Sequence, residues 1–126
     1  MTVQSTLFTT LSTDGDVSAL VAETSSPIIH RIYPNVAPDN VNRPYLVYMV
    51  IADTLPVVFN DVINIREYIL QIDCYATTAD GAQVLADHVV DAVNTGMKLV
   101  QVFNIGSDYD NEVELYRYIC QLTVWH

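Results

Sequence analysis

Three histidines, His30, His88 and His126, are the residues of this sequence best suited to acid–base chemistry or metal binding. His88 is followed three residues later by Asp91 and preceded directly by Asp87. A protein metal site needs three or four ligands, and a single His–Asp pair on one helix face falls short of that number. His30 lies in an apolar, β-branched stretch and is interpreted as a partly buried side chain. We therefore expect no metal site.

Short motifs that bind phosphate or calcium, or that hold a catalytic nucleophile, are missing as well. The four glycines, at positions 15, 81, 96 and 106, do not have the spacing of a phosphate-binding loop. The triplet DGD at 14–16 begins like a calcium loop but lacks the later ligands and the final glutamate. No GxSxG, CxxC or HExxH motif is present. We expect a protein that is not an enzyme and has no cofactor.

Cys74 and Cys120 are the only cysteines. Each falls at an inward position of an alternating pattern, where a thiol behaves as a small apolar side chain. This favours two reduced thiols in the core. A disulfide stays open as an alternative if the two strands prove to be neighbours.

Helical periodicity predicts three helical segments. The first covers residues 2–11, a short turn follows at 17–21, and the longest helix covers 78–95. Thr77 is expected to open the long helix as its cap, and Gly96 to end it. The apolar stripe of this helix, which should face a sheet, consists of Ala82, Leu85, Ala86, Val89 and Val93.

Five apolar or alternating stretches predict strands. They cover residues 28–34, 44–54, 63–76, 97–106 and 113–125, and the last two are separated by SDYDNE, which is expected to form a turn. Strands grouped in the sequence, with helices before and between them, are typical of an α+β fold. We predict a largely antiparallel, twisted sheet of four to five strands, with an N-terminal helix and one long helix packed on one face.

Two segments fifty residues apart share one pattern: YILQIDCY at 68–75 and YICQLTVW at 118–125. In both, large apolar residues alternate with polar ones in the same phase. Strands that cover one core require this repeat, so it indicates a structural rule rather than a duplicated site. The face that carries Gln71 and Asp73 is expected to be the wetter one.

Candidate interaction residues come from two places. Tyr75 and Trp125 lie on the second face of their strands, and aromatic side chains are common at protein interfaces. An apolar run interrupted by a proline reads as an arm, which would either bind a partner or fold back into the core. The arm residues are Leu55, Pro56, Val57, Val58 and Phe59.

Charge and hydropathy exclude several classes of partner. Among 126 residues, 15 acidic and five basic side chains give a net charge of −10, which opposes binding to nucleic acid. No stretch approaches the roughly 20 apolar residues of a membrane span, and the first residues do not resemble a signal peptide. We expect residues 1–126 to form a single, non-membrane domain with a well-solvated surface.

The order of several short motifs resembles the tail-completion or tail-terminator family of long-tailed (siphovirus-type) bacteriophages. A strand ending in R-I-Y-P, a proline-containing loop, a P-Y strand and a Q-I-D strand that runs into a helix with spaced alanines occur in that order over about residues 28–93. The residues are Arg31-Ile32-Tyr33-Pro34, Pro38, Pro44-Tyr45, Gln71-Ile72-Asp73-Cys74-Tyr75-Ala76, Ala79, Ala82 and Ala86.

This resemblance implies a virion protein that assembles in the host cytoplasm into a ring, generally hexameric, on the last ring of the tail tube. Its partners would be the tail tube protein and the head–tail connector proteins, and DNA would pass through without specific binding. The acidic composition is compatible with that passage, since a negative channel wall repels phosphate.

Two other functions remain open at this point. One is a small ligand-binding or regulatory domain that uses a cleft between helix and sheet. The other is an enzyme of unrecognised mechanism, for which no residue can be named.

Overall fold

The computed structural model describes residues 2–23, 29–54 and 66–126. Within these residues two helices, α1 and α2, precede the strands, and a third, α3, lies between two groups of strands, as predicted. In chain order the elements are α1 Val3–Thr13, α2 Gly15–Val21, β1 Ala22–Glu23, β2 Ile29–His30, β3 Ile32–Pro34, β4 Tyr45–Thr54, β5 Glu67–Ala76, α3 Ala79–Gly96, β6 Val100–Asp110 and β7 Leu115–Trp125.

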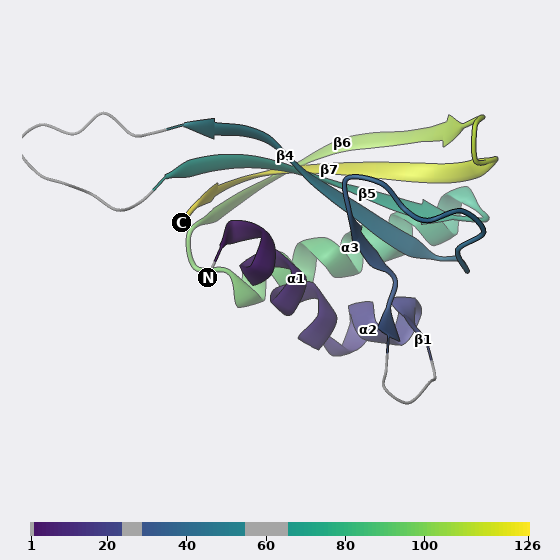
Figure 1. Ribbon diagram of the computed structural model, residues 1–126, viewed down its shortest axis with the longest axis horizontal. Helices are drawn as coiled ribbons and strands as arrows, with labels where there is room; N and C mark the ends of the chain where they lie inside the picture. The colour runs from purple at the N-terminus through teal and green to yellow at the C-terminus, as the bar shows by residue number, and fades with distance from the viewer. Residues whose placement is uncertain (1, 24–28, 55–65) are drawn as a thin grey trace, which may run out of the picture.

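Five of the strands form one sheet in the order β3-β4-β5-β7-β6. All neighbours in it are antiparallel except β3 and β4, so the sheet is mixed. β1 and β2 form a separate two-stranded ladder. α1, α2 and α3 all lie on one side of the sheet, and within the described residues no helix covers the other side, which is called the helix-free face below (Figure 1). The predicted α+β class, with a largely antiparallel sheet and helices on one face, is confirmed.

The main core lies between the helices and the sheet. α3 packs across β5, β6 and β7, and α1 and α2 pack against α3. The predicted stripe of α3 is fully buried, and Ala92 extends it. The repeated segments of β5 and β7 lie on neighbouring strands, with Ile72 opposite Cys120 and Cys74 opposite Tyr118. Both cysteines are 0% exposed and free, so their predicted burial in the core is confirmed.

Side-chain caps begin each helix. The Thr2 hydroxyl accepts from the Ser5 amide at α1, and the Asp14 carboxylate accepts from the Asp16 and Val17 amides at α2. This capping is the role of the DGD triplet. At α3 the cap is Thr78, whose hydroxyl accepts from the Gly81 amide at 3.0 Å. The prediction of Thr77 was wrong by one residue.

Replacing Thr78 by alanine is expected to lower the free energy of unfolding by about 1 kcal/mol, because the first amides of α3 lose an acceptor. Thr77→Ala is the matched control, since Thr77 is also exposed but does not cap the helix. Urea unfolding followed by circular dichroism measures both variants. An equal loss in the two would show that the cap at Thr78 contributes nothing specific.

The stretch at 28–34, predicted as one strand, is divided at Arg31. Its guanidinium donates to the carbonyl oxygens of Pro44 and Leu20, both at 2.9 Å, and its backbone amide donates to Val21. The side chain is 9% exposed. At this inward-facing arginine the pairing of β2 with β1 ends and the pairing of β3 with β4 begins. Two short strands therefore replace the single predicted one.

The hairpin of β6 and β7 is longer than predicted. Residues 107–110, expected to be part of a turn, continue β6, and only 111–114 form the turn. A bulge between Asn104 and Gly106 bends β6, and Gly106 has a φ of 131°, which favours glycine. Tyr116 is 38% exposed and contacts Tyr109 edge to face near the hairpin end.

Candidate interaction site

The helix-free face of the sheet contains a hollow of about 620 Å³, enclosed by segments far apart in the sequence. The loop at 35–43 forms one wall, and the turn between β6 and β7 forms the other. Strands β4, β5 and β7 form the floor. The lining residues used below are Val36, Asp39, Arg43, Tyr45, Asp73, Tyr75, Asp110, Glu112, Val113 and Arg117.

Aromatic rings build the floor. Tyr45 and Tyr75 are directly opposite each other in the sheet, and their rings stack with centroids 4.9 Å apart. Tyr33 packs edge-on against Tyr45 at 6.4 Å. Together with Val47 and Leu115 these rings form a second, small core, and the loop at 35–43 adds Ala37 and Val41 to it. The first half of β4 is therefore buried on both faces.

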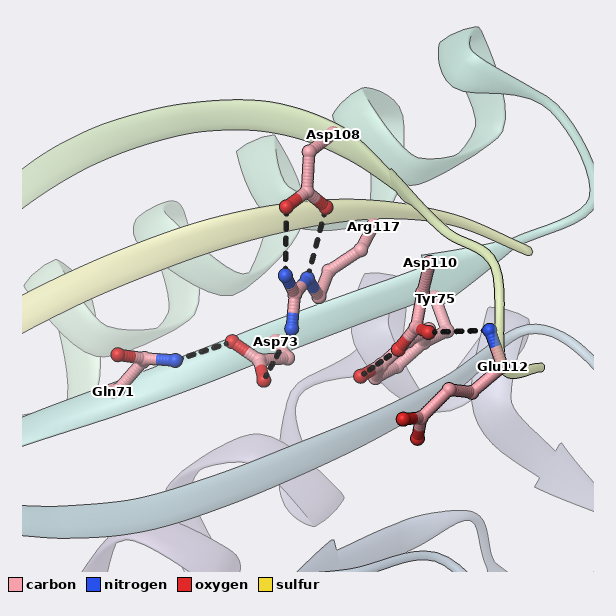
Figure 2. Close-up of polar contacts among 7 residues, drawn as sticks. All are labelled: Gln71, Asp73, Tyr75, Asp108, Asp110, Glu112 and Arg117. Carbon is pink, nitrogen blue, oxygen red and sulfur yellow. Dashed lines mark hydrogen bonds and ion pairs between the residues drawn. The ribbon is translucent and has the colours of Figure 1, made fainter. Parts of the chain in front are cut away.

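A guanidinium joins two carboxylates at the edge of this floor. Arg117 donates to both oxygens of Asp108, at 2.9 Å from Nε and 2.6 Å from Nη2. Its Nη1 lies 3.9 Å from Asp73 Oδ2. Figure 2 shows Arg117 between the two carboxylates, with Gln71 donating to the far side of Asp73 at 2.9 Å. The sheet register explains the arrangement, since Arg117 is opposite Asp108 on one side and Tyr75 on the other.

Further along the hollow, Asp110 forms a second polar group with the turn. Its carboxylate accepts from the Glu112 amide at 3.0 Å and from the Tyr75 hydroxyl at 3.4 Å. Both contacts are drawn in Figure 2. An aspartate that binds the amide two residues ahead is a common stabiliser of turns. Asp110 therefore holds the turn and Tyr75 in place together.

Burial and neighbouring charge shift the pKa values of this site. Desolvation raises the pKa of Asp73 above 3.8, although Gln71 and Arg117 oppose the rise. Desolvation, with the Asp73 charge, raises the pKa of Tyr75 to about 12. Hydrogen bonds from Arg117 lower the pKa of Asp108. The two carboxyl groups on one arginine are therefore shifted in opposite directions, because only Asp73 is buried.

This arrangement corrects one prediction. The strand face with Asp73 was expected to be the wetter one, yet Asp73 is 3% exposed and Tyr75 is 8% exposed. Val47 and Ile119 flank Asp73 on the neighbouring strands and exclude water. The sequence did contain one sign that Asp73 could be buried, namely Arg117 at an outward position of the last strand. A cation there can pair with an aspartate whose burial would otherwise be costly.

The predicted interaction residues are distributed as follows. Tyr75 belongs to the floor of the hollow. Trp125 is partly exposed on the same face but pairs with Glu67 at the opposite end of the sheet, so the structure does not bring the two together. Leu55, Pro56, Val57, Val58 and Phe59 lie outside the described residues. Sequence reasoning missed Arg117, Asp108, Asp110 and the loop at 35–43.

The three histidines each contact one side chain from a distant segment. His30 Nε2 lies 3.1 Å from the Ser18 hydroxyl, and His126 Nε2 lies 3.1 Å from the Thr6 hydroxyl. His88 Nδ1 is 4.0 Å from Asp16 Oδ2 of α2. Among residues 2–23, 29–54 and 66–126, no three His, Cys, Asp or Glu side chains are grouped to hold a metal ion.

Asp73→Asn is expected to change the pH dependence of stability. Because the folded pKa of Asp73 lies above its ordinary value of 3.8, the folded state binds this proton more tightly than the unfolded chain. The contribution of Asp73 to the free energy of unfolding is therefore largest below the ordinary pKa and decreases as the pH rises through the folded pKa. Urea unfolding between about pH 4 and pH 7 should show this decrease in the wild type and not in Asp73→Asn.

Asp108→Asn is the control, because Asp108 should contribute to the pH dependence of stability in the opposite direction. The lowered pKa of Asp108 gives a contribution that is present above the ordinary value and is lost as the pH falls. Superimposable pH profiles for the wild type and Asp73→Asn would contradict the assignment of a raised pKa.

Comparisons with known proteins complete the description of the site. A family model described as "Tail completion protein gp17" matches residues 5–126, nearly the whole chain. The matched span includes every strand, α2, α3 and most of α1, and therefore the whole hollow. Comparison with curated proteins finds no match. In the part of the chain that the structure describes, none of the helices is both long and apolar enough to cross a membrane.

Proposed function

This chain belongs to the tail completion protein gp17 family of bacteriophages, and we propose that it caps the tail tube as a ring, ends tube growth and presents the surface that joins tail to head. As a tail component it is part of the virion. The observation that carries the proposal is the family match over residues 5–126. Before joining the particle, the subunit assembles in the host cytoplasm, with the tail tube protein and the head–tail connector proteins as partners.

The architecture supports a ring because it offers different surfaces at opposite sides of one sheet. Cyclic rings join two unlike patches on each subunit. β6 is an edge strand with Phe103 48% and Ile105 54% exposed. At the other side, β3 pairs with β4 only at Leu46–Tyr48, and beyond it Ile51 is 49% exposed. Apolar side chains at an exposed strand edge are suited to protein contact.

The structure also bears on the alternative of a small ligand-binding or regulatory domain. That function was expected to use a cleft between helix and sheet. The space between α3 and the sheet is filled by Leu85, Val89 and Val93, each 0% exposed. A packed core at that position favours a role in assembly, in which the subunit acts through its outer surfaces.

Charge supports the passage of DNA through the ring. The subunit has a net charge of −10, and six copies would surround the channel with a negative field. The polar stripe of α3, with Asp80, Asp87 and Asp91, is exposed. Phosphate groups would be repelled rather than held, and specific DNA binding is not part of the proposal.

A phage in which the gene for this chain is disrupted tests the proposal. Electron microscopy should show tails of irregular length that are separate from filled heads, and purified protein added to the lysate should restore joined particles. Light scattering and microscopy of the protein on tail tubes should show rings at one tube end. Tails of normal length joined to heads without the protein would overturn the proposal.

A further inference from the structure

The hollow on the helix-free face has more negative than positive groups and an apolar rim. Four carboxylates line it, those of Asp39, Asp73, Asp110 and Glu112, against the two cations Arg43 and Arg117. Arg117 is already bonded through two nitrogens to Asp108. At the rim, Val36 is 76% and Val113 is 40% exposed. A complementary group would therefore combine a positive charge with an apolar side chain.

The turn between α3 and β6 has this chemistry. Lys98 is exposed there, and Leu99 beside it is 53% exposed. Cations are scarce in this chain, with five lysines and arginines in total. Within the described residues Arg31, Arg66 and Arg117 each form an ion pair, Arg43 lines the hollow itself, and Lys98 forms no ion pair.

A subunit cannot place its own Lys98 in its own hollow. The 11 residues of β6, Val100–Asp110, separate the two. At roughly 3.3 Å per residue, this strand holds them on the order of 30 Å apart. Figure 1 shows the α3–β6 turn near the two chain termini and the β6–β7 hairpin end at the opposite side. A contact between them must join two molecules, and it joins unlike patches.

We propose that Lys98 and Leu99 of one subunit insert into the hollow of the next copy of this chain. The ammonium lies between Asp110 and Glu112, and Leu99 packs on Val36 and Val113. The inference rests on the proposed ring, because repetition of a contact between unlike patches closes a ring when the rotation between subunits is suitable. Rim charges of this kind select the partner and orient it.

Cysteine cross-linking tests the contact. Lys98→Cys and Glu112→Cys place thiols on the two patches. The native Cys74 and Cys120 are 0% exposed, so the cross-linker should not reach them. The variants are mixed on tail tubes purified from particles that lack this protein, and a short bismaleimide is added. We expect dimers from the mixture and none from either variant alone. The double variant should give a ladder that ends at the complete ring.

Charge reversal provides a second measurement. Lys98→Glu and Glu112→Lys should each lower ring formation on tubes about tenfold, because a like-charge contact is repeated at every interface. The double variant that carries both substitutions should restore ring formation. Asp91→Lys on the exposed stripe of α3 is the matched control for the added charge and should leave ring formation unchanged.

The outcomes separate the two proposals. Rings without a Lys98→Cys to Glu112→Cys cross-link would overturn this contact and leave the proposed function intact. A cross-link from Glu112→Cys to the tube protein would also overturn it, because the occupant would then be another protein. If the wild-type chain forms no ring on tubes, both proposals are wrong.

Discussion

Replacing Leu85 with alanine is expected to lower the free energy of unfolding by about 3 kcal/mol. Leu85 is 0% exposed and lies at the centre of the inward stripe of α3. Because α3 packs across β5, β6 and β7, a smaller side chain leaves a cavity between the helix and the sheet. The loss combines the transfer free energy of the removed atoms with the cost of that cavity. Urea unfolding measured by fluorescence and circular dichroism would determine it.

Val84→Ala is the control for this change. Val84 precedes Leu85 in the same helix but is 48% exposed, so its truncation should change the free energy of unfolding by less than about 0.5 kcal/mol. Comparable losses at the two positions would mean that α3 does not pack on the sheet as described. Helix propensity cannot produce the loss at Leu85, because alanine favours a helix more than either leucine or valine does.

The second large effect is expected at Arg117. Its replacement by methionine keeps the apolar stem but leaves the buried carboxylate of Asp73 without its cation. Breaking a fully buried pair costs about 3–5 kcal/mol. The Arg117 side chain is 26% exposed, which reduces the effect, and we expect a loss of about 2 kcal/mol at neutral pH. The loss should shrink in acid, where Asp73 binds a proton.

Two further variants separate the buried charge from a general effect of losing an arginine. Asp73→Asn combined with Arg117→Met should recover part of the stability, because the uncompensated carboxylate is gone. Arg66→Met removes an exposed pair, in which Arg66 and Asp53 are 3.2 Å apart and 50% and 41% exposed, and should cost at most about 0.5 kcal/mol. If Arg66→Met were as destabilising as Arg117→Met, burial of Asp73 would not be the cause.

These two variants act on opposite faces of one sheet. Leu85 secures the helix-covered face, where the main core lies, and Arg117 secures the helix-free face, where the hollow and the proposed contact of Lys98 lie. A stable variant at Arg117 with impaired ring formation would connect the shape of the hollow to assembly. The aromatic floor of Tyr45 and Tyr75 gives that face a rigid base.

Periodicity along the chain predicted the fold class, the long helix and its buried stripe, and the shared phase of β5 and β7. It did so because each pattern depends on neighbours two to four residues apart, and the apolar face of a helix or strand must be buried whatever the topology. The family resemblance depended on motifs of the same local kind. The burial of Cys74 and Cys120 was also predictable from the phase of their strands.

Tertiary structure alone decided where polar side chains became buried. Arg31 divides a predicted strand because Leu20 and Pro44, distant in the sequence, offer their carbonyl oxygens. Asp73 is buried because the register places it between Val47 and Ile119 and near Arg117. Burial of a charge depends on partners and water exclusion supplied by other strands, which no local pattern encodes. For the same reason no local pattern predicts the hollow, which exists because the loop at 35–43 and the β6–β7 turn face each other across the sheet.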